Sequence, residues 1–334
     1  MFCSLRSLLI AACLTQCANA VAADRSIIKS SVPATPDRCA KSEPLPGTPE
    51  VPGGDIFGIL SPTDIGDPCT FSSASETTGR AGKRDGRYVT ATTKSQFTYT
   101  YSDQLSFAVS PFVSAFSWSD VTVNRGILFT TGLGVDRPNL NTIDFDGVSA
   151  EASWRVLQRA PNQPLAMTLS TEPRTFRRDA ITGYRVEGRQ IELKLFADIA
   201  FSEHWFGAVN LVYGFGTQRF DIPGAEMQKG SAYGLTGALT WQAYKDEAAS
   251  VQGVFVGAEA RHIAGFSGLT LNFRVGEGLF AGPTLAVAFK GGSMLNLVWS
   301  PQVWGRALPP SSPGLFDLDS FERHQFRIKF AMPL

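Results

Sequence analysis

The sequence predicts an all-β fold: a transmembrane up-and-down antiparallel β-barrel of about 12 strands, with 10 as the alternative, behind an irregular N-terminal leader. Three observations predict it. Apolar and polar residues alternate over long stretches, the connections between stretches are alternately short and long, and no apolar run reaches the roughly 18–20 residues of a membrane helix. We expect a signal peptide at residues 1–23, an irregular periplasmic leader at 24–54 and the barrel at 55–334.

The first residues have the composition of a secretory signal peptide. Arg6 precedes the apolar run Leu8–Cys13, and small residues follow, so we expect cleavage between Ala20 and Ala23. The letters "IAAC" at 10–13 also allow a lipoprotein cleavage box, but the apolar stretch before the cysteine is short for such a signal.

Composition and cysteine usage restrict the class of partner. Lys plus Arg (30) balance Asp plus Glu (30), so no charge excess points to nucleic acid. Removal of the signal peptide leaves two of the five cysteines, Cys39 and Cys69, for which we expect a disulfide in an oxidising compartment. Two free thiols are the alternative. Neither cysteine has the neighbours of a zinc site, so we predict no metal and no cofactor.

The strand pattern begins at Tyr88 and is clearest at residues 186–201, "VEGRQIELKLFADIAF". Most of the stretches are about twice as long as the 5–6 residues usual for globular strands, which suits tilted strands that cross a bilayer. The predicted strands are 88–101, 104–118, 143–157, 164–177, 186–201, 204–219, 229–242, 250–263, 278–289, 293–305 and 321–334.

The connections indicate a barrel and give its direction. Short connections such as 102–103 alternate with long ones such as 119–142, as in transmembrane barrels, whereas a soluble sandwich has Greek-key crossings. The strand after residue 88 therefore runs towards the periplasm, and an earlier strand must carry the chain outwards. We expect "DIFGILS" at 55–61 to be that first strand, followed by a loop at 62–87.

Charged residues gather on the face opposite the apolar one. A charge on the lipid side costs about 2–4 kcal/mol at the bilayer midplane, so these side chains are expected inside. The interior is then either a narrow water-filled pore or a lumen closed by paired charges. The predicted lumen-lining residues are Glu151, Arg155, Glu172, Arg174, Glu192, Lys194, Asp198, Glu259, Arg261, Arg323, Arg327 and Lys329.

Nothing in the sequence indicates a catalytic site. Barrel hydrolases place His and Ser two residues apart on one strand, and none of His204, His262 and His324 has Ser at that spacing. The loop acids are too scattered for a rim protease. They are Asp136, Asp144, Asp146 and Asp179. We therefore predict a protein that is not an enzyme.

The closing residues "FERHQFRIKFAMPL" resemble the C-terminal signature of Gram-negative outer-membrane β-barrel proteins, although the last residue is Leu334 where an aromatic is usual. "GDIFGILSPTDIGDP" and "LDSFERH" also resemble a group of proteobacterial outer-membrane proteins of unknown function. The resemblance implies location in the cell outer membrane and a last strand that the barrel assembly machinery reads. The residues of that assembly signal are Phe326, Ile328, Phe330, Met332 and Leu334.

These features predict a narrow channel or binding barrel for small polar solutes, in contact with outer-membrane lipids and without catalysis. The alternative is a structural or surface-interaction barrel, closed by its charge pairs and acting through loops at 62–87, 119–142 and 306–320. A soluble exported β-sandwich is a third possibility. No oligomeric state is predicted.

Overall fold

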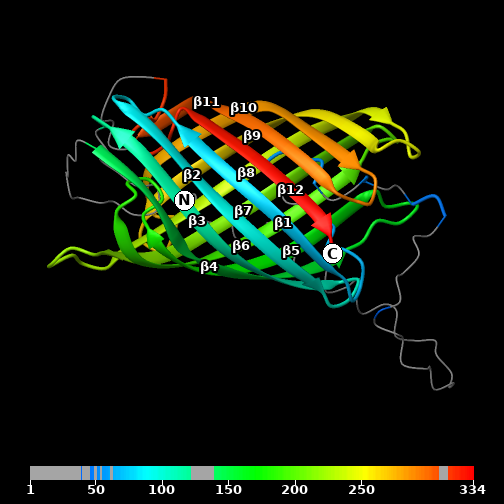
Figure 1. Cartoon of the computed structure of the whole chain (residues 1–334), viewed down its shortest axis with the longest axis horizontal. Coiled ribbons are helices and arrows are strands. Elements are labelled where there is room, and N and C mark those ends of the chain that lie inside the picture. Colours follow the sequence, from blue (N-terminus) through cyan, green and yellow to red (C-terminus); the bar gives the residue numbers. More distant parts are fainter. Residues whose placement is uncertain are drawn as a thin grey trace, which may run out of the picture. The chain divides into compact units, whose positions relative to one another are not determined.

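A computed structural model describes residues 39, 46–48, 51–52, 55–60, 63–121, 139–307 and 315–334. In these ranges, 12 antiparallel strands form one closed barrel (Figure 1). The strands are β1 (Phe71–Ala81), β2 (Arg87–Thr100), β3 (Leu105–Ser119), β4 (Asn139–Leu157), β5 (Leu165–Arg178), β6 (Arg185–Ala200), β7 (Trp205–Phe220), β8 (Gln228–Lys245), β9 (Val251–Ser267), β10 (Phe273–Phe289), β11 (Met294–Ala307) and β12 (His324–Pro333). The predicted fold class is confirmed. The predicted signal peptide lies outside the described residues.

The first strand was predicted in the wrong place. Residues 55–60 are not a strand, and β1 instead occupies part of the predicted loop at 62–87. The outer face of β1 carries small polar side chains such as Ser75 and Thr77, so it gives no apolar alternation. Every later predicted range, from 88–101 to 321–334, overlaps one of β2 to β12.

The barrel closes between its first and last strands. Ser72 of β1 pairs with Pro333 of β12, and Ala81 pairs with His324 at the other end of the ladder. Because every strand has two neighbours, the sheet has no free edge whose backbone groups would face lipid unpaired.

The two ends of the barrel differ in their connections. At one end, here the turn end, lie the chain terminus and the connections 101–104, 158–164, 201–204, 246–250 and 290–293. At the other, the loop end, lie the connections 82–86, 179–184, 221–227 and 268–272, together with residues 120–121 after β3 and 315–323 before β12. The predicted alternation of short and longer connections is therefore an alternation between two ends.

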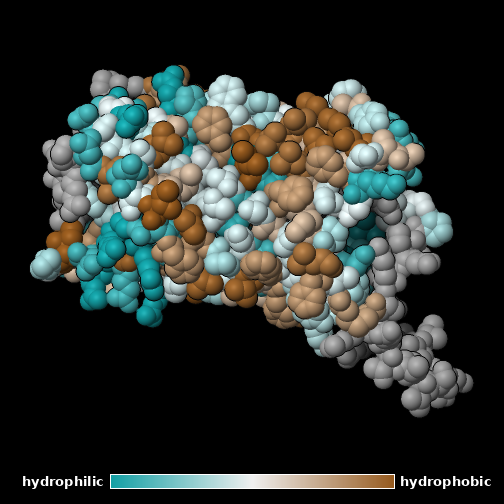
Figure 2. All heavy atoms as spheres, in the orientation of Figure 1, coloured by the Kyte–Doolittle hydropathy of each residue, from teal (hydrophilic) through white to brown (hydrophobic). Residues whose placement is uncertain are grey.

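The outer surface is apolar around its middle. Large side chains such as Ile191, Leu193 and Val209 are exposed there, and Trp205 and Trp241 lie side by side near the turn end with ring centroids 6.5 Å apart. Figure 2 shows hydrophobic side chains over the middle of the barrel and hydrophilic ones gathered towards its ends. Among the described residues, no helix is long and apolar enough to cross a membrane.

Four prolines lie inside strands, where each lacks a backbone donor. Pro111, Pro173, Pro283 and Pro301 coincide with interruptions of one neighbouring ladder: the β2–β3, β4–β5 and β10–β11 pairings skip these positions. The prolines are thus accommodated where the ladder is already irregular.

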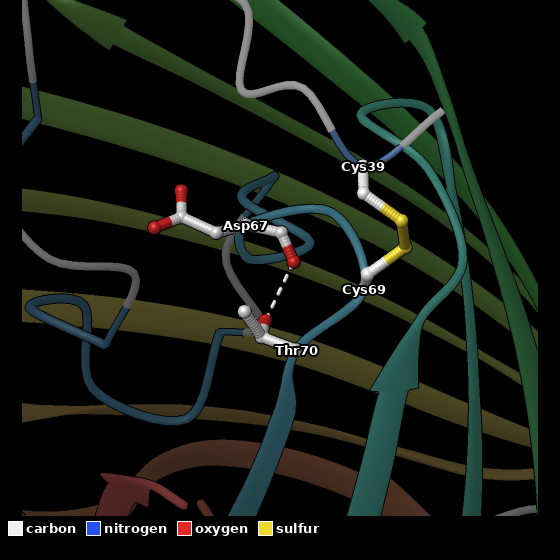
Figure 3. Close-up of a disulfide and its surroundings, with 4 residues drawn as sticks. All are labelled: Cys39, Asp67, Cys69 and Thr70. Atoms are coloured by element: carbon white, nitrogen blue, oxygen red, sulfur yellow. Dashed lines mark hydrogen bonds between the residues drawn. A yellow bond between two sulfur atoms is a disulfide. The ribbon is translucent and has the colours of Figure 1, made fainter. Parts of the chain in front are cut away.

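A disulfide joins Cys39 to Cys69, with the two Cα atoms 5.3 Å apart (Figure 3). Cys69 lies directly before β1, where its backbone N–H donates to the carbonyl of Thr100 at 2.7 Å, and the Thr70 hydroxyl donates to the carbonyl of Asp67 at 2.5 Å. The bond therefore fixes Cys39 beside the turn end of β1 and closes a chain loop that contains residues 46–65.

Candidate functional site: the barrel interior

A segment of the chain lies inside the barrel. Residues 55–60 and 63–65, here the plug, include Ile56, Phe57 and Leu60, each at most 1% exposed. They pack against inward-facing side chains of β7, β9, β10 and β11, namely Phe206, Phe255, Ala286 and Met294. The apolar residues that we interpreted as a membrane strand therefore fill the lumen on one side, near the turn end.

Interior carboxylates and cations bind the plug backbone. Glu259 accepts a hydrogen bond from the Ile59 N–H at 2.6 Å, and Asp198 accepts from both the N–H and the hydroxyl of Thr63, at 3.2 and 2.6 Å. Arg327 donates to the carbonyl of Gly58. Hydrogen bonds to charged groups are the stronger class, so these contacts position the plug as well as satisfying its polar groups.

Further ion pairs tie the plug to the barrel wall. Lys329 lies 2.6 Å from Asp55, and Arg155 lies 2.7 Å from Asp64. Gly58 is also a requirement of the fit, because a Cβ there would overlap the Glu259 carboxylate and lie 2.6 Å from the Thr284 methyl group.

A second group of charges lies on the inner faces of β2, β4, β5 and β6. The ammonium of Lys194 is within ion-pair distance of three carboxylates, those of Glu151 at 3.4 Å, Glu192 at 3.8 Å and Glu172. Lys94 lies 2.6 Å from Glu172. Strands β2 and β5 are not neighbours, so this last pair spans part of the interior.

The remaining predicted lumen residues are placed as follows. Arg174 lies 3.7 Å from Glu192 and over the rings of Phe112 and Phe176, and Arg261 lies over the ring of Phe280. Arg323 precedes β12 at the loop end, where it is exposed and lies over the ring of Phe316. Arg323 therefore belongs to a loop and not to the wall of the lumen.

Sequence reasoning missed several interior charges. Glu76 pairs with Arg327 at 2.7 Å, but it lies on the strand that we misplaced. Lys94 is the single charge of its predicted strand, so no pattern of charges marked it. Asp55, Asp64 and Arg159 lie in segments that were predicted differently or as a connection, and Arg159 pairs with Asp198. The only indication in the sequence was that Lys94 lies two residues from Thr92 and from Gln96, which places these three polar side chains on the same face of the strand.

The two sides of the lumen differ in how tightly they are filled. Phe206 and Phe255, beside the plug, are at most 1% exposed. The side chains of Lys94, Glu76 and Arg174 are 26%, 30% and 29% exposed although they lie on inward faces. Solvent therefore reaches the charged side of the interior, along β1, β2 and β5, and not the apolar side.

The described part of the connection before β12, residues 315–323, also enters the barrel. Phe321 and Ser320 are fully buried, and Asp317 packs against Gly276 and Gly305, where a Cβ on Gly305 would lie 2.5 Å from the Asp317 nitrogen. We call residues 315–323 the inner loop. It narrows the loop end as the plug narrows the turn end.

Basic residues at the loop end hold the inner loop. The Lys83 ammonium donates to the carbonyl of Phe321 at 2.7 Å, Arg80 lies 3.4 Å from Glu322, and Arg84 lies 2.6 Å from Asp319. Burial lowers the pKa of Lys83 to about 8, although the nearby carboxylates Glu322 and Asp317 oppose that shift.

The histidines and loop acids have structural contacts. His204 is exposed in a turn, His262 lies 3.5 Å from Glu277, and His324 lies against the rings of Trp299 and Phe326. Asp146 and Asp179 accept backbone hydrogen bonds, Asp144 pairs with Arg178, and Asp136 lies outside the described residues. Within the described ranges, no group of three or more metal-ligating side chains could hold an ion.

The predicted assembly signal lies on the outer surface. Phe326, Ile328, Phe330, Met332 and Leu334 are 40–68% exposed. Their alternation places one continuous apolar stripe on β12, beside β1 and β11. Recognition of this stripe by the assembly machinery stays a prediction.

Comparison with known proteins gives one family and a fold. The chain matches a family of unknown function (DUF6662) over residues 49–334, and no curated protein matches it. The solved structure of the COG4313 outer membrane channel from Pseudomonas putida F1 is similar at 10% identity and a TM-score of 0.55, covering 85% of this chain and 100% of that one.

Two autotransporter domains are also similar. They are the beta domain of the Bordetella autotransporter BrkA, at 9% identity, TM-score 0.49 and coverage of 80% and 100%, and the translocator domain of NalP from Neisseria meningitidis, at 12%, 0.44 and 79% and 88%. The likeness to the Pseudomonas putida structure shows a shared outer-membrane barrel fold.

Proposed function

The chain belongs to this family of unknown function, and we propose that it is an outer-membrane β-barrel that passes or binds small polar solutes without catalysis. One observation carries the proposal: the apolar part of the plug packs against β7 and β9–β11, while charged residues on the inner faces of β2 and β5, such as Lys94 and Arg174, stay partly exposed.

Location in the outer membrane is supported by the surface of the barrel. Its middle exposes large apolar side chains, the ladder has no free edge, and the N-terminus has the composition of an export signal. We assign the turn end to the periplasm because barrels of this class have short turns there. The expected partners are outer-membrane lipids and the barrel assembly machinery, with no nucleic acid and no cofactor.

The charged residues on the inner faces of β2, β5 and β6 favour a particular class of solute. Rings of one sign select ions of the opposite sign, but here Lys94, Glu172, Lys194 and Glu192 alternate in sign. A path with this lining offers partners to both ends of a polar or zwitterionic molecule. We therefore propose small polar solutes of low net charge, and a conductance with weak ion selectivity.

Conductance of the purified protein in a planar lipid bilayer tests the proposal. We expect small single-channel steps, because the plug and the inner loop both narrow the path. Absence of steps in several salts, from the wild-type protein and from a variant with a disrupted plug, would exclude a channel. Absence of solute binding by the same preparations would exclude a binding barrel as well.

A second candidate function has its own supporting observation. Phe321 and Glu322 of the inner loop are at most 1% exposed, so the loop end is closed by a well-packed segment. A structural or surface-interaction barrel would be closed in this way and would act through its loops. Since β1 occupies much of 62–87, those loops would be 82–86, 120–138 and the region before β12. Conductance separates this function from the first.

A further inference from the structure

The outer surface carries a basic patch at the loop end of β5 to β8. Its residues are exposed side chains of Arg177, Arg185, Arg189, Arg219 and Lys229. In the closed order of the strands, this patch lies opposite the seam between β1 and β12.

The register of the strands places cations beside hydroxyl groups. Arg189 of β6 pairs with Thr175 of β5 on one side and with Thr217 of β7 on the other, and Thr217 pairs with Lys229 of β8. Across β5 to β8, one row of paired residues therefore carries a hydroxyl, a guanidinium, a hydroxyl and an ammonium group in that order. Paired positions of a sheet lie about 4.5–5.5 Å apart, so one ligand can contact adjacent members of the row.

The next level towards the loops adds a second arginine. Glu187 pairs in register with Arg219, lies 3.1 Å from it and 3.7 Å from Arg189, and remains 61% exposed. Arg189 and Arg219 are themselves 76% and 54% exposed. In the described part of the chain, no carboxylate lies within ion-pair distance of Arg177 or Lys229. Glu187 and the exposed Asp221 are outnumbered by the five cations, so the patch keeps a positive excess.

The patch lies where the apolar belt ends. Ile191 and Leu193 follow Arg189 on the same face of β6 and are exposed. At about 3.3 Å per residue, Arg189 is within roughly 7 Å of the first of them along the strand. An arginine there covers apolar surface with its stem and holds its charge at the level of lipid headgroups.

A hollow accompanies the charges. It has a volume of about 970 Å³ and is lined by the four arginines of the patch, by Arg178, by apolar side chains such as Phe145, Val148 and Ile222, and by the carboxylates of Asp144, Glu187 and Asp221. Cationic and apolar groups lining one hollow match a ligand that has anionic groups next to acyl chains.

We propose that the basic patch binds the phosphorylated sugar headgroup of an outer-leaflet glycolipid of the lipopolysaccharide class. Guanidinium groups form paired hydrogen bonds with phosphate oxygens, and the hydroxyls of Thr175 and Thr217 can donate to phosphate or sugar oxygens. The inference uses the proposed outer-membrane location, which assigns the loop end to the outer leaflet. It does not depend on solute passage.

The test uses the full barrel refolded in detergent from lipid-free inclusion bodies. Native mass spectrometry measures binding of bisphosphorylated lipid A, of lipid A without phosphates, of phosphatidylglycerol and of inorganic phosphate. The test variant is Arg189→Gln/Arg219→Gln. The matched control is Arg87→Gln/Arg306→Gln, which removes two exposed arginines from the loop end of β2 and β11.

We expect the test variant to bind bisphosphorylated lipid A at least about tenfold more weakly than the wild type, and the control to stay within about twofold. Heat-modifiable migration reports whether each variant is folded; if the first does not fold, Arg177→Gln/Lys229→Gln takes its place with the same expectation. Equal binding by test variant and wild type would overturn the proposal. Equal affinity for phosphatidylglycerol, or for inorganic phosphate, would overturn the glycolipid assignment.

The location is tested separately, because binding in detergent needs no membrane. Recovery of the protein outside the outer-membrane fraction would refute the proposed function, whatever the lipid A result.

Discussion

The ammonium of Lys94 on β2 lies 2.6 Å from a carboxylate oxygen of Glu172 on β5, although these two strands are not neighbours in the barrel. The pair therefore reaches across the interior. Glu172 also pairs with Lys194, so the partly exposed Lys94 is connected to the ion pairs around Lys194. Two consequences follow, one for ion selectivity and one for stability.

Replacing Lys94 should change selectivity. The Lys94→Gln variant removes a partly exposed cation from a lining of mixed sign, so the path becomes more attractive to cations. We expect the reversal potential in a salt gradient to shift towards the equilibrium potential of the cation. Lys245→Gln, which removes an exposed lysine at the turn end of β8, should leave the reversal potential unchanged. An unchanged reversal potential in Lys94→Gln would mean that the conducting path does not pass Lys94.

Replacing Lys194 should cost stability. The Lys194→Met variant leaves Glu151, Glu172 and Glu192 without their shared cation, and loss of one partner of a buried ion pair typically costs about 3–5 kcal/mol. Urea unfolding of the detergent-solubilised barrel, followed by tryptophan fluorescence, measures the change. Lys245→Met is the control, and we expect less than about 1 kcal/mol there. A similar loss in both variants would contradict the role of the network.

The inner loop should respond to pH. Because burial lowers the pKa of Lys83 from 10.5 to about 8, the unfolded chain binds more protons than the folded chain between these two values. The stability contributed at this site therefore rises with pH from about 8 to 10.5. As the pH rises through this window, we expect the urea midpoint of the wild type to increase relative to that of Lys83→Met. Lys290→Met, at an exposed lysine of a turn, should run parallel to the wild type.

The disulfide should restrain the plug. Cys39 and Cys69 flank the plug in the chain, so their bond holds the N-terminal side of the plug close to the barrel as well as its C-terminal side. Opening the bond lengthens the free chain and raises the entropic cost of keeping the plug inside. We expect reductant to increase the fraction of time that wild-type channels are open. The Cys39→Ser/Cys69→Ser variant should show the higher value without reductant and no response to it; equal values throughout would refute the restraint.

The sequence predicted most of the barrel because its wall repeats a two-residue pattern. On β6, the alternation that exposes Ile191 and Leu193 places Glu192 and Lys194 on the other face. The pattern fails where the outer face is not apolar. Ser75 and Thr77 of β1 lie on that face, so no alternation marked this strand.

The plug could not be predicted by the same reasoning. Ile56, Phe57 and Leu60 are apolar because they meet Phe206 and Phe255 inside the barrel, and a short apolar run has the same appearance whether it faces lipid or protein. The contacts that distinguish the two cases lie far away in the sequence: Glu259 holds Ile59 across about two hundred positions. Long-range pairing of this kind leaves no local periodicity.

Displacing the plug should enlarge the conductance, and one methyl group is enough to test it. In Gly58→Ala, the new Cβ would overlap the Glu259 carboxylate and lie 2.6 Å from the Thr284 methyl group, so the contact between the plug and its Glu259 anchor must break or shift. We expect larger or more frequent single-channel steps than in the wild type. Gly79→Ala is the matched control, because its Cβ would meet nothing closer than 3.8 Å on β1. If both variants conduct like the wild type while remaining heat-modifiable, the plug does not limit passage, and the narrowing must lie at the inner loop.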